Sequence, residues 1–450
     1  MSSAPSEKLE NVSFIEHFVS PYLRGVKFSF TQGDQRRSFD LALRHSSVAT
    51  LLFHKDQKKF VFVRQFRPAV LVGHILRQPE NFGKKLDEIS WSDYDASPGY
   101  TLELCAGLID KSISAVDIAR EEIEEECGYA VRSEDIHFVA TFSVAAHESG
   151  GTQYLYYAEI DDSMQVNEGG GNVDEGEYIT KVFLTESEAL EFLNNDYCPG
   201  PPSMLYALLW WFGHKPTDVK KQSPLDAYTW KPKDTVPMSD FKFEKMPSSS
   251  RFVPHRMRFT LGPLTRTWDL ALCDDSFSVL LFNESSNELL FTQRFRPAAL
   301  VGQARHRSSP GIELEAIDWA TQPLDWAYTL EMCSGHHKRG SSVLEIENRV
   351  RDAVSRKCGY ALDSIRFVTS FIVGISFAGD RQRAYYAAVN DTMRIPNWNP
   401  CEDIIPCPIG CSKIPSFLRA EIPTGPPAVL FMMQWFLNNI EQQQPLRLEH

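Results

Sequence analysis

A run of glutamates in the first half of the chain has the residue types and spacing for metal chemistry. The segment AREEIEEECGY at 119–129 places five carboxylates within six positions. On a helix, Glu122, Glu125 and Glu126 share one face at i, i+3 and i+4, where like charges repel by a few tenths of a kcal/mol per pair. The run is either a solvated acidic face or a cradle for a hard cation such as Mg²⁺, which takes carboxylate oxygens and substrate phosphates.

The overall composition limits the classes of protein to which the chain can belong. It has 450 residues, of which 43% are hydrophobic, enough for roughly two or three domains with ample cores. Its net charge of -13 argues against nonspecific nucleic-acid binding, which depends on a basic surface. We therefore expect no nucleic-acid partner.

The N-terminal segment and the cysteines bear on the compartment. The opening MSSAPSEKLENVSFIEHF has acidic residues and lacks the apolar stretch of a signal peptide. No apolar run approaches the about 20 residues that span a bilayer. The nine cysteines are scattered and odd in number, which fits reduced thiols better than a disulfide framework. We expect a cytoplasmic protein with no membrane partner.

The chain contains two copies of one unit, visible when the sequence is aligned with itself. SFDLALRHSSVATLLF at 38–53 returns as TWDLALCDDSFSVLLF at 267–282. Between the copies lies a stretch rich in Pro, Lys and Asp, as expected of a linker. The expected organisation is a first domain at 1–216, a linker at 217–245, a second domain at 246–440 and a tail at 441–450.

Each copy reads as an α+β unit. VATLLFH and KFVFVRQF, separated by polar residues, predict a hairpin. After the CAG turn, apolar Ile118 and Ile123 on one side and acids on another predict a helix that carries the carboxylates. PPSMLYALLWWFGH predicts a helix begun by prolines, with Trp210 and Trp211 in the core.

The acidic segment resembles the Nudix box, G-x5-E-x7-R-E-U-x-E-E-x-G-U, in which U is a bulky aliphatic residue. The match is GLIDKSISAVDIAREEIEEECGY, at 107–129. Its fixed positions hold Gly107, Glu122, Ile123, Glu125, Glu126 and Gly128, with Tyr129 in the last hydrophobic slot. The flanking SPYLRGVKFSF, VRQFRPAV, TLELCAGLID and DEGEYI resemble the uridine diphosphate glucose pyrophosphatase branch, close to the ADP-ribose pyrophosphatases. Similarity covers nearly all of 15–215 and, more weakly, 245–440.

The resemblance implies two tandem α/β/α sandwich domains of the Nudix type. It also implies cleavage of a nucleoside diphosphate sugar, of the UDP-glucose or ADP-ribose class, into a nucleoside monophosphate and a sugar phosphate. By position, Glu122, Glu125, Glu126 and the carbonyl of Ala106 would hold Mg²⁺, or Mn²⁺ in its place. The metal would offset the repulsion among the carboxylates and polarise phosphoryl oxygens.

The family often supplies its catalytic base from a mobile loop after the box, and NEGGGNVDEGEYI at 167–179 has that character. Glu177 is favoured over Glu175 as the base, and a merely flexible acidic loop is the alternative. Glu103 would help to bind metal or substrate.

Arginines before the box are candidates for substrate recognition. Arg64 and Arg67, in VRQFRP, suit phosphate or ribose because guanidinium groups pair bidentately with anions. A structural ion pair is the alternative. Arg24 is a further candidate for the same reason.

Two positions depart from the box. Ile113 stands where the box has its first Glu, and Glu121 stands where it has Arg. The neighbouring Arg120 lies about 100° around the helix from position 121. The alternative function is therefore an impaired Nudix-fold protein that binds nucleotide sugars or a protein partner.

The second copy departs further. Aligned on its CGY, it holds Ala353, Arg356 and Lys357 where the first copy holds its three aligned glutamates, so we predict no catalysis there. Glu402 remains near the position of the loop glutamate. Members of the resembled branch are homodimers whose subunits complete each other's sites. The tandem chain is therefore expected to form an intramolecular pseudo-dimer, and a homodimer of chains is a further option.

Overall fold

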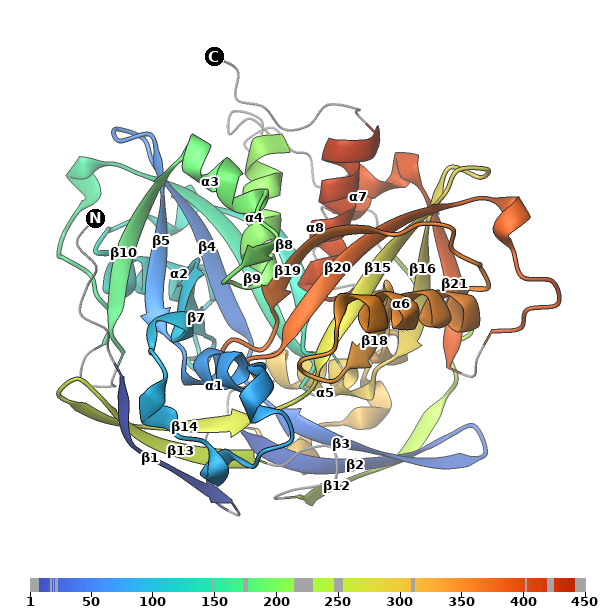
Figure 1. Cartoon of the computed structure of the whole chain (residues 1–450), viewed down its shortest axis with the longest axis horizontal. Coiled ribbons are helices and arrows are strands. Elements are labelled where there is room, and N and C mark those ends of the chain that lie inside the picture. The colour runs from blue at the N-terminus through green and yellow to red at the C-terminus, as the bar shows by residue number, and fades with distance from the viewer. Residues whose placement is uncertain are drawn as a thin grey trace.

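The computed structural model describes residues 8–16, 18, 20, 23–146, 149–172, 177–213, 230–246, 254–308, 312–400, 403–418 and 425–441. It is an α+β structure in which two mixed sheets stand side by side (Figure 1). Within the described residues, no helix is long and apolar enough to cross a membrane. The described cysteines are all free thiols, as predicted.

The two sheets share one strand order, which confirms the internal repeat in three dimensions. The first follows β10-β5-β4-β9-β8, with β6 beside β5 and β7 beside β4. Its strands are β4 (Ser47–His54), β5 (Lys59–Phe66), β6 (Tyr100–Glu103), β7 (Cys105–Leu108), β8 (Ile136–Val144), β9 (Gly151–Ile160) and β10 (Ile179–Thr185). The β4–β5 hairpin, predicted from the sequence, is antiparallel with Leu52 opposite Val61.

The second sheet repeats this order as β21-β16-β15-β20-β19, with β17 beside β16 and β18 beside β15. Its strands are β15 (Asp275–Asn283), β16 (Glu288–Phe295), β17 (Tyr328–Glu331), β18 (Cys333–His337), β19 (Arg366–Ile372), β20 (Arg381–Val389) and β21 (Ile404–Gly410). A short strand of the first half, β11 (Tyr197–Cys198), pairs in parallel with β19.

Helices cover both faces of each sheet because the strands alternate apolar side chains between the two sides. Along β5, Phe60 and Phe62 enter one core, while Val61 and Val63 enter another. The helices are α1 (Pro68–Leu76), α2 (Ala115–Glu122), α3 (Glu186–Leu193), α4 (Pro202–Gly213), α5 (Pro297–His306), α6 (Val343–Cys358), α7 (Ile414–Phe417) and α8 (Pro427–Phe436).

One core is common to the two halves. The predicted aromatic helix α4 lies beside α8, and both belong to a cluster that also includes side chains from both sheets (Figure 1). Trp210 in α4 is 5% exposed and lies against Tyr157, with ring centroids 5.6 Å apart, so its predicted core role is confirmed. Because apolar surface from both halves is buried together, folding of each half is linked to the other.

The N-terminal hairpin of each half packs on the opposite half. The first is β2 (Arg24–Gln32) with β3 (Gln35–Leu43), and the second is β13 (Pro254–Leu261) with β14 (Leu264–Ala271). Phe28 of β2 lies against Trp319, with centroids 6.0 Å apart, and Phe259 of β13 lies 5.9 Å from Phe66.

An outer strand from the opposite half completes each hairpin sheet. β1 (Leu9–Glu16) pairs with β13, and β12 (Met238–Lys245) pairs with β2. The sequence analysis placed 238–245 in the linker, but these residues form a strand. The hairpin exchange is visible at the bottom of Figure 1.

Two glycines allow a helix of each half to touch a loop of the other. A Cβ on Gly73, in α1, would lie 2.2 Å from the carbonyl oxygen of Gly379. A Cβ on Gly302, in α5, would lie 1.9 Å from the carbonyl oxygen of Gly150. These distances are shorter than any real contact, so only glycine fits at either position.

Candidate metal and phosphate site

The predicted carboxylates converge where the end of α2 faces β7. Ser114 caps α2 by accepting a hydrogen bond from the Asp117 amide. The helix continues as a π-helical turn, η5 (Ile123–Cys127), which ends at Gly128 with φ 80°. Such π turns are frequent at functional sites. In the second half α6 runs as one regular α-helix over the equivalent residues, so the π turn is particular to the half that carries the carboxylates.

Glu126 is a buried carboxylate with one oxygen left over. The residue is 1% exposed, and its Oε2 accepts a hydrogen bond from the Ala106 amide at 2.9 Å. Its Oε1 is buried and has no hydrogen-bond partner. Burial, followed by the proximity of Cys127 and Glu122, raises the pKa of Glu126 well above its usual value.

Glu122 lies directly over β7. A Cβ on Gly107 would lie 1.8 Å from its Oε1, so the glycine of the box makes room for this carboxylate. Burial, then Glu125 and Glu177, raises the pKa of Glu122 to about 7. Burial is the largest cause, and the neighbouring carboxylates add to it, as expected when like charges share a site.

The glycine loop predicted to carry the catalytic base is tied to the same helix end. The amides of Gly170 and Gly171 donate to the carbonyl oxygens of Glu126 and Glu125, at 3.0 and 3.2 Å. Glu177 follows this loop, and its charge contributes to the raised pKa values of Glu122 and Glu126. Glu125 is exposed at the end of the helix. Glu175 lies outside the described residues.

These residues fit a divalent cation. The charges of Glu122 and Glu177 act on Glu126, and among the described residues one oxygen of Glu126 is buried without a hydrogen-bond partner. Hard cations take carboxylate and carbonyl oxygens, so Glu122, Glu125, Glu126 and the Ala106 carbonyl form a suitable donor set. A cation here would remove the cost of burying uncompensated charge.

Glu121, which replaces the arginine of the box, is paired with a lysine that the sequence analysis did not single out. Lys111 Nζ lies 2.7 Å from Glu121 Oε2, whereas Arg120 approaches Glu121 only to 3.9 Å. Lys111 also lowers the pKa of Glu122, against the larger effects that raise it. The extra charge at 121 is therefore neutralised locally. Ile113 is 41% exposed in the loop before α2.

Glu103 and Arg67 form a buried ion pair with each other. Arg67 donates to both oxygens of Glu103 at 2.7 Å, and Glu103 is 3% exposed. The second half repeats the pair, since Arg296 donates to both oxygens of Glu331 at 2.6 and 2.8 Å. A pair kept in both halves supports the structural ion pair that the sequence analysis held as the alternative.

The other two predicted arginines lie apart from this pair. Arg64 is exposed, with its guanidinium carbon 4.0 Å from the centroid of the Tyr100 ring. Arg24, on β2, pairs with Glu313 of the second half at 2.6 Å, and both side chains are exposed. The structure thus gives Arg24 a partner in the second half instead of bringing it to the carboxylates.

The equivalent place in the second half holds a built-in cation. Lys357, at the position of Glu126, donates from Nζ to the carbonyl oxygen of Ser334 at 2.5 Å, and Ser334 is the counterpart of Ala106. Burial, together with nearby Arg294 and Arg356, lowers the pKa of Lys357 against the opposite effect of Cys333. An ammonium group therefore occupies the side of the carbonyl where the first half would place a metal. Glu402 lies outside the described residues.

A second group of possible ligands is better explained as structural. His54, Asp56 and Asp162 place one ligand atom each within 4.8 Å of one another. In the first half His54 Nε2 lies 3.3 Å from Asp162 Oδ1. In the second half Asn283 stands in place of His54, and its Nδ2 donates to Asp391 Oδ1 at 3.4 Å. Because asparagine makes the same link, the cluster ties a hairpin turn to a loop and needs no metal.

The exchanged hairpin of the second half reaches the loop of the first site. The guanidinium carbon of Arg266, on β14, lies 4.5 Å from the centroid of Tyr178, which follows Glu177. The mirror residue Arg37, on β3, binds Asp403 of the second half at 2.8 Å. The sequence analysis missed both arginines, although each directly precedes the repeated S/T-F/W-DLAL segment.

The similar proteins each match less than half of the chain. No protein-family model matches the chain. Uridine diphosphate glucose pyrophosphatase NUDT14 of Mus musculus is 32% identical over 219 residues, which cover 46% of this chain and 95% of that protein. GDP-mannose pyrophosphatase of Cronobacter sakazakii is 32% identical over 174 residues, covering 38% of this chain and 76% of that protein. A solved structure of an ADP compounds hydrolase covers 43% of this chain and 86% of its own, at 18% identity and a TM-score of 0.28.

The mixed sheet, the glutamate-bearing helix and the carboxylate cluster define a Nudix-type protein. The identity over 95% of the mouse protein shows that the chain belongs to the Nudix family, within the group that includes the uridine diphosphate glucose pyrophosphatases.

Proposed function

We propose that the first half hydrolyses the pyrophosphate bond of a nucleoside diphosphate sugar, of the UDP-glucose or ADP-ribose class, to a nucleoside monophosphate and a sugar phosphate. The observation that carries this proposal is the buried, unbonded Oε1 of Glu126 beside Glu122. The names of the similar proteins, which act on UDP-glucose or GDP-mannose, support the substrate class.

Mg²⁺, with Mn²⁺ as the alternative, is the proposed cofactor. Glu122, Glu125, Glu126 and the Ala106 carbonyl would hold it. When bound, the ion supplies charge stabilisation to the phosphoryl oxygens of the substrate. The chain's own residues hold the carboxylates in place, and Glu177 would accept the proton of the attacking water at its carboxylate.

Arg64 is the better placed of the predicted arginines for recognition of substrate phosphate or ribose, because its guanidinium is exposed beside Tyr100. Arg67 and Glu103 would act by fixing the sheet edge near the carboxylates. The charges of Glu126 and Glu177 help to raise the pKa of Arg67 against the effect of burial, which supports this proximity. Glu103 then positions Arg67 rather than touching the substrate.

The two halves would act as a pseudo-dimer in which one site is retained. The proposed units are 1–216 and 246–440, with 441–450 as a tail and with 217–245 between the units, of which 238–245 form the strand β12. Burial of α4 with α8, and the contact between Arg266 and Tyr178, support a second half that completes the first site without chemistry of its own. The free thiols support a reducing, cytoplasmic setting.

The alternative, a noncatalytic protein that binds nucleotide sugars or a protein partner, was motivated by Glu121 and Ile113. The ion pair between Lys111 and Glu121 weakens that motive because it neutralises the unexpected charge.

Incubation of the full chain with UDP-glucose, ADP-ribose or GDP-mannose and Mg²⁺ tests the proposal. We expect turnover that EDTA abolishes and that Glu125→Gln strongly reduces. Arg356→Gln, at the matched position of the second half, should leave turnover unchanged. Metal-independent turnover, or none on any of the three substrates, would refute the proposal.

A further inference from the structure

A charged pocket lies between the two halves, apart from the carboxylate site. Its volume is about 190 Å³, and its charged lining residues are Arg77, Asp275, His337, Arg381 and Arg383. Arg77 comes from the first half, directly after α1, and the others come from the second half. Gly340 and Ser341, just before the start of α6, complete one wall. Neither half could form this pocket alone.

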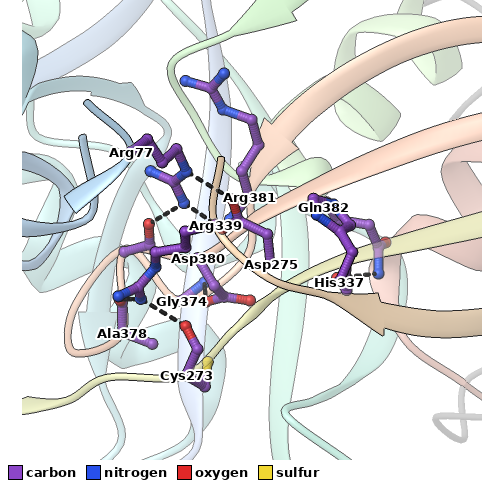
Figure 2. Close-up of polar contacts among 12 residues, drawn as sticks. Arg77, Cys273, Asp275, His337, Arg339, Gly374, Ala378, Asp380, Arg381 and Gln382 are labelled. Carbon is purple, nitrogen blue, oxygen red and sulfur yellow. Dashed lines mark hydrogen bonds and ion pairs between the residues drawn. The ribbon is translucent and has the colours of Figure 1, made fainter. Parts of the chain in front are cut away.

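The lining carries more positive than negative charge. Arg77 forms a bidentate ion pair with Asp275, which also accepts a hydrogen bond from the Arg381 amide at 2.9 Å. The Arg381 guanidinium instead lies over Tyr197, 4.1 Å from the ring centroid, and Arg383 Nε donates to the Tyr385 hydroxyl at 2.9 Å. Behind the lining, Arg339 donates to the carbonyl oxygens of Cys273 and Ala378, and Asp380 accepts from the Gly374 amide (Figure 2).

Several buried nitrogen atoms of the lining have no hydrogen-bond partner. His337 is 6% exposed, its Nδ1 lies 3.0 Å from the Lys338 carbonyl oxygen, and its Nε2 is unbonded. Arg77 Nη1 and Arg381 Nε are likewise buried and unbonded. Leaving such groups unpaired costs about 1–3 kcal/mol each, and more when they are charged. The pocket is therefore polar but incompletely satisfied.

The mirror contact of the other sheet shows that packing does not require these charges. There, Thr152, Tyr154 and His306 stand in place of Arg381, Arg383 and Arg77. Tyr154 bonds His306 at 2.7 Å, and the Thr152 hydroxyl accepts from Gln303 Nε2 at 2.6 Å. The Thr152 amide donates to the Ser46 hydroxyl. At the equivalent position in the second half, the Arg381 amide donates to the Asp275 carboxylate.

The same interface thus holds neutral groups that bond one another at these three positions in one copy, and three arginines there in the other. Burial and the proximity of Arg77 lower the pKa of Arg381, despite the opposite effect of Asp275. Burial, Arg381 and Arg77 also lower the pKa of His74, which stands on α1 beside this contact. The charge of Arg381 is therefore incompletely compensated by its surroundings.

We propose that this interface pocket is a binding site for a small oxyanion, namely phosphate, diphosphate or the phosphate group of a larger ester. The guanidinium groups of Arg77, Arg381 and Arg383 supply the donors that such an anion accepts. The start of the 16-residue helix α6 adds positive potential at the Ser341 wall. The pocket is smaller than the about 300–1,000 Å³ that drug-sized ligands occupy, which limits the enclosed part to one or two phosphoryl groups.

Calorimetric titration of the full chain tests this site directly. The probes are inorganic phosphate, inorganic diphosphate and glucose 1-phosphate, each added in EDTA so that the carboxylate cluster holds no metal to attract them. We expect saturable binding of at least one probe. Arg381→Gln and Arg383→Gln should each weaken it at least about tenfold, as the loss of a charge-assisted hydrogen bond implies.

Arg305→Gln is the matched control. This buried arginine lies on α5, in the mirror contact, and donates to the Arg44 carbonyl oxygen, so its loss should leave the titration unchanged. If circular dichroism shows that a glutamine variant does not fold, Arg383→Lys is the substitute. It keeps the positive charge but lacks the bidentate guanidinium, so it should still bind the probes more weakly than the native chain does.

Tighter binding of glucose 1-phosphate than of inorganic phosphate would identify an ester as the ligand, and the reverse order would identify the free anion. Absence of binding for all three probes would overturn the proposal, as would equal affinity in the native chain and both arginine variants. The result does not depend on hydrolase activity, so it stands or falls separately from the proposed function.

Discussion

The two halves of the chain share one fold but carry side chains of opposite charge at one equivalent position. In the first half, Glu126 accepts from the Ala106 amide and leaves an oxygen unbonded. In the second, Lys357 fills the equivalent position and binds the Ser334 carbonyl oxygen. Both helices nevertheless pack on their sheets in the same way. The carboxylates are therefore not needed to fold the unit, which is the expected relation between a site and the fold that carries it.

The second half serves as an internal control for the first. Features present in both halves, such as the ion pairs Arg67–Glu103 and Arg296–Glu331, are explained by the scaffold. Features of the first site that the equivalent place in the second half lacks, namely the carboxylates, the π turn η5 and the glycine loop, are those that the proposed metal and substrate would explain. Experiments on matched pairs of residues can separate the two kinds.

The largest expected effect is on stability and should be equal in the two halves. Glu103→Gln and Glu331→Gln each leave a buried arginine without its carboxylate, which should cost about 3–5 kcal/mol of unfolding free energy. Chemical denaturation of both variants measures this. If Glu103→Gln lost much unfolding free energy and Glu331→Gln lost little, the two pairs would not be equivalent. Glu103 would then have a role in the metal and substrate site.

The next effect is on activity and should be confined to one half. Glu126→Gln removes a proposed metal ligand, and kcat/KM should fall about a hundredfold or more, because a metal contributes several kcal/mol to the transition state. Lys357→Gln is the matched change and should leave kcat/KM within about twofold of the native value. Equal losses from the two changes would show that the second half is not catalytically silent.

A smaller effect is expected where the exchanged hairpin meets the loop of the first site. Arg266→Gln removes a cation that stacks on Tyr178, and kcat/KM should fall about two- to fivefold, which corresponds to the usual strength of such a contact. Arg37→Gln, the mirror change, should leave kinetics unaltered. An unchanged kcat/KM for Arg266→Gln would show that this residue of the second half does not contribute to the first site.

A further expected effect is a pH dependence of the metal-free chain. Glu122 has a folded-state pKa of about 7, raised by burial and by Glu125, so the folded state binds more protons than the unfolded state below that pH. Unfolding free energy should therefore fall as pH rises from about 5 to about 8 in EDTA. Thermal melts should show a shallower slope for Glu122→Gln, and Mg²⁺ should reduce the slope in the native chain. A slope that is the same in both proteins would exclude Glu122 as its source.

Much of the fold could be predicted from the sequence because the repeat and the strand and helix patterns are local signals. The β4–β5 hairpin, α4 and the carboxylate-bearing α2 all follow from apolar periodicity and from turn residues. In these places the local chemistry alone determines the structure. Regular helix spacing predicted one face for the three aligned glutamates, but the structure places Glu125 and Glu126 in the π turn η5, with Glu125 exposed and Glu126 buried.

The exchange of hairpins could not be predicted in the same way. β2–β3 and β13–β14 have similar sequences, so nothing local says which half each one covers. The Lys111–Glu121 pair depends on a loop whose path the sequence does not fix. The strand β12 was read as linker because its exposed polar residues resemble a connection, although β2 supplies the backbone partner.

Counting bound Mn²⁺ by electron paramagnetic resonance, with a nonhydrolysable nucleoside diphosphate sugar present, tests the central claim most directly. The account predicts Mn²⁺ binding in the native chain and in Lys357→Gln, and its loss in Glu126→Gln. Retention of the native Mn²⁺ count by Glu126→Gln, or no Mn²⁺ on the native chain, would contradict it.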